Sequence, residues 1–139
     1  MAGAIPKRRR VSPVPKVTRY VLRESDVQRV VLAYLHAKGL FVWRQNNTGL
    51  FDPRIGRYRP STGLLGVADI LGVLPDGKFL AIECKSTTGK PSEPQVTFLA
   101  NVNARGGRAF IVRSLEDLKE HIGEYLGEPA RSIPAGAPW

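Results

Sequence analysis

The stretch that decides the fold is residues 66–86, GVADILGVLPDGKFLAIECKS. It contains two apolar runs, 67–74 and 78–85, separated by Pro75-Asp76-Gly77. Proline favours the second position of a type I turn, and glycine suits the left-handed residue that follows such a turn. The stretch therefore predicts two antiparallel strands joined by a tight turn.

The register of this hairpin depends on the length of its loop. A three-residue loop pairs Leu74 with Lys78 and, counting back along both strands, places Asp69 opposite Glu83. The alternative two-residue loop pairs Pro75 with Lys78, which puts a proline into the ladder, where prolines are poorly tolerated. We favour the three-residue loop and expect the two carboxylates to face each other.

Facing carboxylates in an apolar hairpin repel each other unless something compensates. A Mg²⁺ ion held by Asp69 and Glu83 removes this repulsion, and the backbone carbonyl of Cys84 can add a ligand. Lys85 points to the same face as Glu83, whereas the Cys84 side chain points to the opposite face, toward the core. An ion with an ammonium group beside it can activate water and stabilise charge on a phosphate. The alternatives are a proton shared by the two carboxylates and an ordinary ion pair between Lys85 and either acid.

The hydrophobic spacing around the hairpin predicts the other elements of the fold. Helices are expected at residues 24–38, 92–105 and from 114 onward, and strands at 40–43 and 109–112. Ser25 and Gln28 have the spacing of a capping box, and Trp43 is expected in the core. The order helix, three strands, helix, strand, helix is typical of a three-layer α/β core with a mixed four-stranded sheet.

Composition and charge divide the chain into three parts. The 139 residues carry 21 Lys and Arg against 12 acids, a net charge of +9. Seven of these cations and no acid lie in residues 1–23, which we expect to be a flexible arm that binds polyanions or, alternatively, only aids solubility. One folded domain is expected at residues 24–126 and a flexible Gly/Pro/Ala-rich tail at 127–139.

Other compositional features exclude whole classes of protein. The single cysteine excludes an internal disulfide framework and a multi-cysteine zinc site. The longest apolar run falls far short of the roughly 18–20 residues that span a bilayer. The basic N-terminus has no apolar stretch behind it, so a secretory signal is not expected. These features favour an intracellular protein without a membrane segment.

Residues 44–66 show no periodicity and are long for a loop within a compact domain. They mix cations with polar and aromatic side chains, a composition that nucleic-acid contacts often have, although a solvated loop is the alternative. The candidate DNA contacts are Lys7, Arg8, Arg9 and Arg10 of the arm, Arg44, Asn46, Arg54, Arg57 and Arg59 of this segment, and Lys90.

The motifs resemble the virus-type replication-repair nuclease (VRR-NUC) family of the PD-(D/E)XK nuclease superfamily. The resemblance runs from about Glu24 to Ile122. Its motifs are Glu24 at the start of the first helix, GVADI at 66–70, AIECKS at 81–86, GKPSEPQ at 89–95, and Gly106-Gly107. The residue before Asp69 is alanine, where the superfamily name implies proline.

The resemblance implies a restriction-endonuclease-like core and a nuclease that depends on Mg²⁺ or Mn²⁺. It makes Asp69 and Glu83 metal ligands and Lys85 the catalytic lysine, with Glu24 completing the acidic cluster and Gln95 supporting it. Glu24 can alternatively serve only the helix dipole, and Gln95 only a helix cap. Stand-alone phage and bacterial members of the family look like homodimers that act on branched DNA, including Holliday junctions. The resemblance therefore implies a homodimer with a branched DNA substrate.

The sequence thus predicts a metal-dependent endonuclease that hydrolyses DNA phosphodiester bonds. We see no base-reading motif, so selection by DNA shape or branching is expected rather than by sequence. The competing hypothesis is a non-catalytic nucleic-acid-binding module that retains the nuclease fold. Such a module would bind DNA without depending on Asp69 or Glu83.

Overall fold

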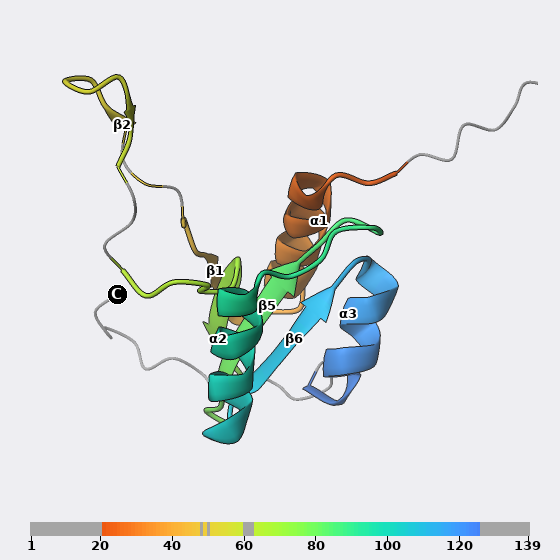
Figure 1. Ribbon diagram of the computed structural model, residues 1–139. Helices are drawn as coiled ribbons and strands as arrows, with labels where there is room; N and C mark the ends of the chain where they lie inside the picture. Colours follow the sequence, from red (N-terminus) through yellow and green to blue (C-terminus); the bar gives the residue numbers. More distant parts are fainter. Residues whose placement is uncertain (1–20, 48, 50, 60–62, 126–139) are drawn as a thin grey trace, which may run out of the picture.

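The computed structural model describes residues 21–47, 49, 51–59 and 63–125 of the chain (Figure 1). The basic arm, except for its last three residues, and the C-terminal tail lie outside the described residues. The elements are α1 (Glu24–Ala37), β1 (Phe41–Arg44), β2 (Phe51–Asp52), β3 (Arg57–Tyr58), β4 (Ile70–Val73), β5 (Phe79–Cys84), α2 (Glu93–Ala104), β6 (Arg108–Val112), α3 (Leu115–Ile122) and a 3₁₀ turn (Gly123–Tyr125).

The main sheet has four strands in the order β1-β4-β5-β6. The first two neighbouring pairs are antiparallel, and β5 and β6 are parallel, so the sheet is mixed as predicted. The parallel pair requires a crossover, and α2 provides it. A second, two-stranded sheet consists of β2 and β3 alone.

The turn between β4 and β5 has the predicted three-residue loop. Val73 pairs with Phe79, and the Leu74 N–H donates to the Lys78 carbonyl at 2.9 Å. Gly77 has a φ of 87°, in the left-handed region that glycine occupies without steric cost. The register predicted from the turn chemistry is therefore confirmed.

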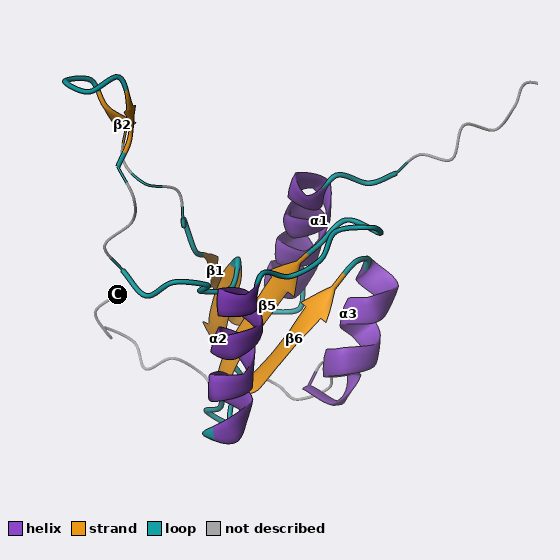
Figure 2. Ribbon diagram, viewed as in Figure 1, coloured by secondary structure: helices purple, strands orange, loops and turns teal. Residues whose placement is uncertain are grey.

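The helices cover the two faces of the sheet and make three layers (Figure 2). Helices α1 and α3 pack on one face, and their Val31, Leu35 and Leu118 are fully buried against the apolar side chains of the strands. Helix α2 packs on the other face through Leu99, against Leu71, Ala81 and Ala109. The small alanine side chains let α2 approach the sheet closely.

Two local predictions about the first helix and strand are wrong. Helix α1 begins at Glu24 with Arg23 as its N-cap residue, and no side chain caps it, so Ser25 and Gln28 form no capping box. Trp43 is 38% exposed and lies against Phe41, with ring centroids 5.6 Å apart. Trp43 lies on the α2 face of the sheet, but α2 packs over β5 and β6 and leaves edge strand β1 uncovered.

The described residues between 44 and 66 include a hairpin that their composition did not predict. Strands β2 and β3 form an antiparallel hairpin in which Phe51 pairs with Tyr58 and Asp52 with Arg57. The hairpin projects from the main body (Figure 1). An ion pair between the buried Asp52 and the exposed Arg59 holds its base together.

Among the described residues, no helix is both long and apolar enough to cross a membrane.

Candidate metal centre

The centre is built on the β4–β5 hairpin, which brings Asp69 beside β5. Asp69 directly precedes β4, and the confirmed register places it opposite Glu83. The backbone N–H of Cys84 donates to Asp69 Oδ2 at 2.9 Å and fixes the orientation of this carboxylate. The alternation of the strand directs Glu83 and Lys85 to the face on which α2 packs and the Cys84 side chain into the opposite core, as predicted.

Helix α1 supplies the third carboxylate, because its first residue is Glu24. Carboxylate oxygens of Glu24, Asp69 and Glu83 all lie within 4.8 Å of one another, with Glu83 buried and the other two half-buried. Three acidic groups so close together repel one another unless positive charge compensates. Oxygen ligands at this spacing can hold a divalent cation.

The environment of Glu83 fits a cation. Its Oε1 atom accepts hydrogen bonds from Lys85 Nζ at 2.9 Å and from Gln95 Nε2 at 2.6 Å. Its Oε2 atom is buried and has no hydrogen-bond partner within the described part of the chain. A buried carboxylate oxygen without a partner is costly, and a metal ion at this position would satisfy it.

Lys85 is the positive charge of the centre. Its side chain is 9% exposed, and Nζ lies 2.9 Å from Glu83 Oε1 and 3.5 Å from Glu24 Oε1. Burial alone would lower the pKa of Lys85, but the hydrogen bond and charge of Glu83, with the charges of Glu24 and Asp69, raise it. The ammonium group is therefore charged at neutral pH and is held in place by two of the three carboxylates.

Burial shifts the pKa values of the Glu83 carboxyl and the Cys84 thiol upward, the opposite of its effect on Lys85. It raises the pKa of Glu83, although the hydrogen bond from Lys85 opposes this shift. Burial also raises the pKa of Cys84, and the three carboxylate charges add to the shift. The thiol is thus protonated at neutral pH and serves as a small core residue rather than as a nucleophile.

Gln95 both caps helix α2 and hydrogen-bonds to Glu83. Ser92 Oγ accepts from the Gln95 N–H, and Gln95 Oε1 accepts from the Ser92 N–H at 2.8 Å, which completes a capping box at the start of α2. The other end of the same amide donates to Glu83. The cap therefore fixes the rotamer that reaches the metal centre.

Arg113 braces the loop that follows Lys85, a role that the sequence did not reveal. One nitrogen of its guanidinium, Nη1, donates to the carbonyls of Ser86 and Gly89, both at 2.6 Å. Arg113 directly follows β6, and the parallel pairing of β5 with β6 brings it to this loop. The signal available in the sequence was its position directly after the strand that follows the crossover helix, because such a strand lies parallel to β5.

The predicted DNA contacts are distributed over separate places. Lys7, Arg8, Arg9 and Arg10 lie outside the described residues. Arg44 is exposed at the end of β1, close to the candidate metal centre. Lys90, in the loop before α2, and Asn46 are also exposed. Arg54, Arg57 and Arg59 all belong to the β2–β3 hairpin, where Arg59 is paired with Asp52.

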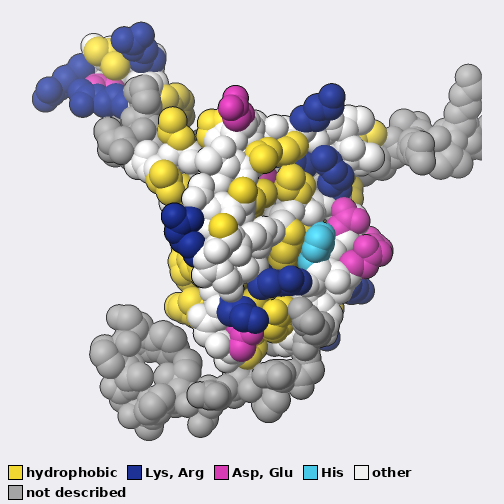
Figure 3. All heavy atoms as spheres, turned by 60° about the horizontal axis from the view of Figure 1, so that its bottom comes forward, with side chains coloured by type: hydrophobic (Ala, Val, Ile, Leu, Met, Phe, Trp, Pro, Cys, Tyr) yellow, Lys and Arg dark blue, Asp and Glu magenta, His cyan; other side chains and the backbone are white. Residues whose placement is uncertain are grey.

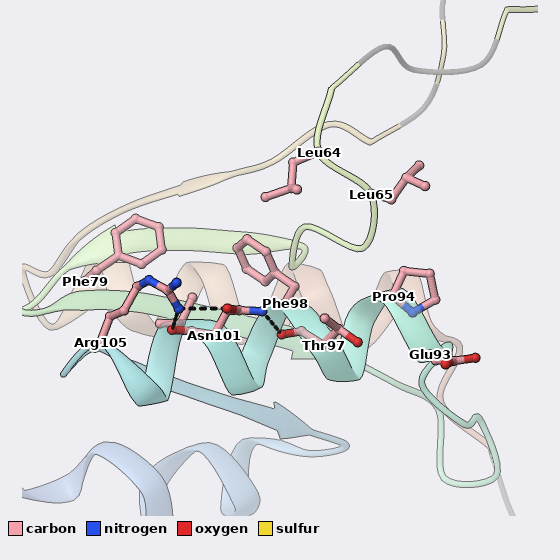
Figure 4. A pocket seen from close by; sticks show the side chains of 11 residues that line it. Leu64, Leu65, Phe79, Glu93, Pro94, Thr97, Phe98, Asn101 and Arg105 are labelled. Atoms are coloured by element: carbon pink, nitrogen blue, oxygen red, sulfur yellow. Dashed lines mark hydrogen bonds between the residues drawn. The ribbon is translucent and has the colours of Figure 1, made fainter.

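An apolar cavity of the described chain lies apart from these carboxylates. It has a volume of about 790 Å³ and lies between Leu64, Leu65 and the face of α2 that carries Pro94 and Phe98 (Figure 4). The loop at Gly66 packs so closely on Pro94 that a Cβ there would overlap the Pro94 carbonyl. No acidic residue of the centre lines the cavity.

Comparison with protein-family models, with curated proteins and with solved structures finds no match to this chain.

Proposed function

We propose that this protein is a metal-dependent endonuclease that hydrolyses DNA phosphodiester bonds. The observation that carries the proposal is the set of three carboxylates within 4.8 Å of one another, with a buried lysine beside them. The unpartnered Glu83 oxygen supports a cation at the same place. Hard oxygen ligands favour Mg²⁺, and Mn²⁺ is expected to substitute for it.

The residues of the centre would divide the work of hydrolysis. Glu24, Asp69 and Glu83 would hold Mg²⁺, which would make a bound water more acidic and polarise a phosphoryl oxygen. Lys85 is placed to stabilise the negative charge that develops on the phosphate as water attacks, because its ammonium group is fixed beside two carboxylates. Gln95 keeps Glu83 oriented, and Asp69 is oriented by the Cys84 N–H.

The fold is compatible with the proposed chemistry. A mixed four-stranded sheet between helices, with the acidic residues at a hairpin, is what the resemblance to VRR-NUC nucleases implies, and we propose a restriction-endonuclease-like core on this basis. The same resemblance supports branched DNA as the substrate and a homodimer as the assembly. The mass of the protein in solution tests the assembly.

Cleavage of defined DNAs tests the proposal. Linear duplex, single-stranded, flapped and four-way DNA are incubated with Mg²⁺, Mn²⁺ or EDTA. We expect cleavage with either metal and none in EDTA. Lys85→Met should reduce the rate by at least about 10²–10³-fold, the usual effect of removing one group that stabilises the transition-state charge. Lys119→Met, which removes a lysine from α3, is the matched control and should cleave at the normal rate.

The competing module has a different signature in the same experiment. A non-catalytic DNA-binding protein would bind these DNAs equally well with and without metal and would cleave none of them. Its binding would also survive Asp69→Asn and Glu83→Gln unchanged. Binding without cleavage of any substrate, by folded protein, would overturn the proposed enzyme.

A further inference from the structure

The β2–β3 hairpin is connected to the fold directly beside the metal centre. Its outgoing chain starts at Gln45, whose N–H donates to the carbonyl of Asp69 at 2.7 Å. The side chain of Asn47 donates to the carbonyl of Val67 at 2.6 Å, so the outgoing chain is tied to the chain that returns toward Asp69. The chain that leads to the hairpin therefore leaves the fold beside Asp69.

Two aromatic side chains are exposed on this hairpin. Phe51 is 53% exposed and Tyr58 is 66% exposed, although they are directly paired across the two strands. Their rings meet edge to face, with centroids 5.3 Å apart. Exposed apolar side chains that are adjacent and rimmed by polar groups are typical of an interaction surface.

The charges of the hairpin favour a polyanion. It carries Arg54, Arg57 and Arg59 against one acid, Asp52. Asp52 accepts from the Arg59 guanidinium and from the Arg54 backbone N–H, so this acid neutralises Arg59 alone. Arg54 and Arg57 form no ion pair with any residue that the structure describes, so their side chains can contact an external anion. Figure 3 shows the projection covered by dark blue side chains around yellow ones.

We propose that the β2–β3 hairpin binds unpaired DNA next to the cleavage site. Bases stack on Phe51 and Tyr58, and the phosphates of the same strand contact Arg54 and Arg57. A ring can stack on a base only when that base is not covered by its neighbours in a duplex, so the hairpin would favour flaps and branch points over intact duplex. This inference rests on the proposed endonuclease function and names how its substrate is selected.

Binding in EDTA tests the hairpin separately from catalysis. The probes are a fluorescently labelled single strand, a flapped duplex and an intact duplex. We expect Phe51→Leu/Tyr58→Leu to weaken binding of the first two by about 10–100-fold, the usual value of base stacking on aromatic rings. Binding of the intact duplex should not change. Leucine keeps an apolar pair across the strands, so the hairpin is expected to remain folded.

The arginines have a different expected signature. Arg54→Ala/Arg57→Ala should weaken binding of all three DNAs and reduce the slope of log affinity against log salt by about two. Tyr58→Phe retains a stacking ring and should bind normally, and so should Lys119→Ala on α3. Normal binding of the single strand by the double leucine variant would overturn the inference, and so would equal losses on all three DNAs.

The two proposals fail in distinguishable ways. If the hairpin inference is wrong but the enzyme is right, the leucine variant cleaves flapped DNA at the normal rate with Mg²⁺. If the enzyme is wrong but the hairpin is right, the unchanged protein cleaves nothing and still prefers unpaired DNA in EDTA.

Discussion

Glu83 makes the stability of the metal-free protein depend on pH. Its pKa is raised above the ordinary value of 4.5, chiefly by burial. The folded protein therefore keeps a proton on Glu83 at pH values where the unfolded chain has lost it. The contribution of this group to the free energy of unfolding is fully present below pH 4.5 and declines as pH rises through the folded pKa. Denaturant unfolding in EDTA at a series of pH values measures this.

Glu83→Gln isolates this effect from the other acids of the protein. Glutamine is neutral at every pH and keeps an oxygen that can accept from Lys85 and Gln95. The stability of the original protein minus that of the variant should therefore fall as pH rises above 4.5. A difference that is flat or rises over this range would contradict the raised pKa.

At the scale of the element, the β4–β5 turn should be sensitive to its glycine. Gly77 has a φ of 87°, where an L-residue carries a steric penalty, so we expect Gly77→Ala to destabilise the protein by about 1–2 kcal/mol. Gly123 has a φ of −52° and open space around the position of a Cβ. Gly123→Ala is therefore the matched control and should be neutral or slightly stabilising. Equal losses in thermal or denaturant unfolding would argue against a special turn.

The start of α2 combines a structural and a functional role that two substitutions can separate. Ser92→Ala removes the cap acceptor and should cost about 0.5–2 kcal/mol of stability while changing the cleavage rate little. Gln95→Glu keeps an acceptor for the Ser92 N–H but replaces the donor to Glu83 by a negative charge. It should therefore lower cleavage more than Ser92→Ala does. The opposite order of the two variants would show that Gln95 only caps the helix.

The register prediction succeeded because it rests on local chemistry, whereas the exposure of Trp43 and the bonds of Arg113 depend on distant parts of the chain. The turn at Pro75–Gly77 fixes the register of its own strands, so the facing of Asp69 and Glu83 could be predicted from a few residues. The exposure of Trp43 depends on how far α2 extends over the sheet, which no pattern near Trp43 encodes. Similarly, the bonds of Arg113 arise from a parallel pairing across a crossover.

At the scale of the whole molecule, the three carboxylates connect separate parts of the fold. Glu24 opens α1, Asp69 precedes β4 and Glu83 lies in β5, so a bound ion would hold a helix and two strands together. An ion that binds only the folded state stabilises it by an amount that grows with the logarithm of its concentration, about 2.7 kcal/mol at a hundred times its dissociation constant. We therefore expect Mg²⁺ or Mn²⁺ to raise the melting temperature and EDTA to reverse the rise.

Two variants decide whether this stabilisation comes from the proposed centre. Asp69→Asn keeps an oxygen that can accept from the Cys84 N–H but removes one negative charge from the cluster, so the metal-dependent rise should largely disappear. Glu120→Gln removes an exposed acid from α3 and should leave the rise intact. The metal-free Asp69→Asn protein should also be at least as stable as the original, because it relieves repulsion among the three acids. A metal-dependent rise that persists in Asp69→Asn would place the ion elsewhere in the chain and remove the main support for metal-assisted hydrolysis at this centre.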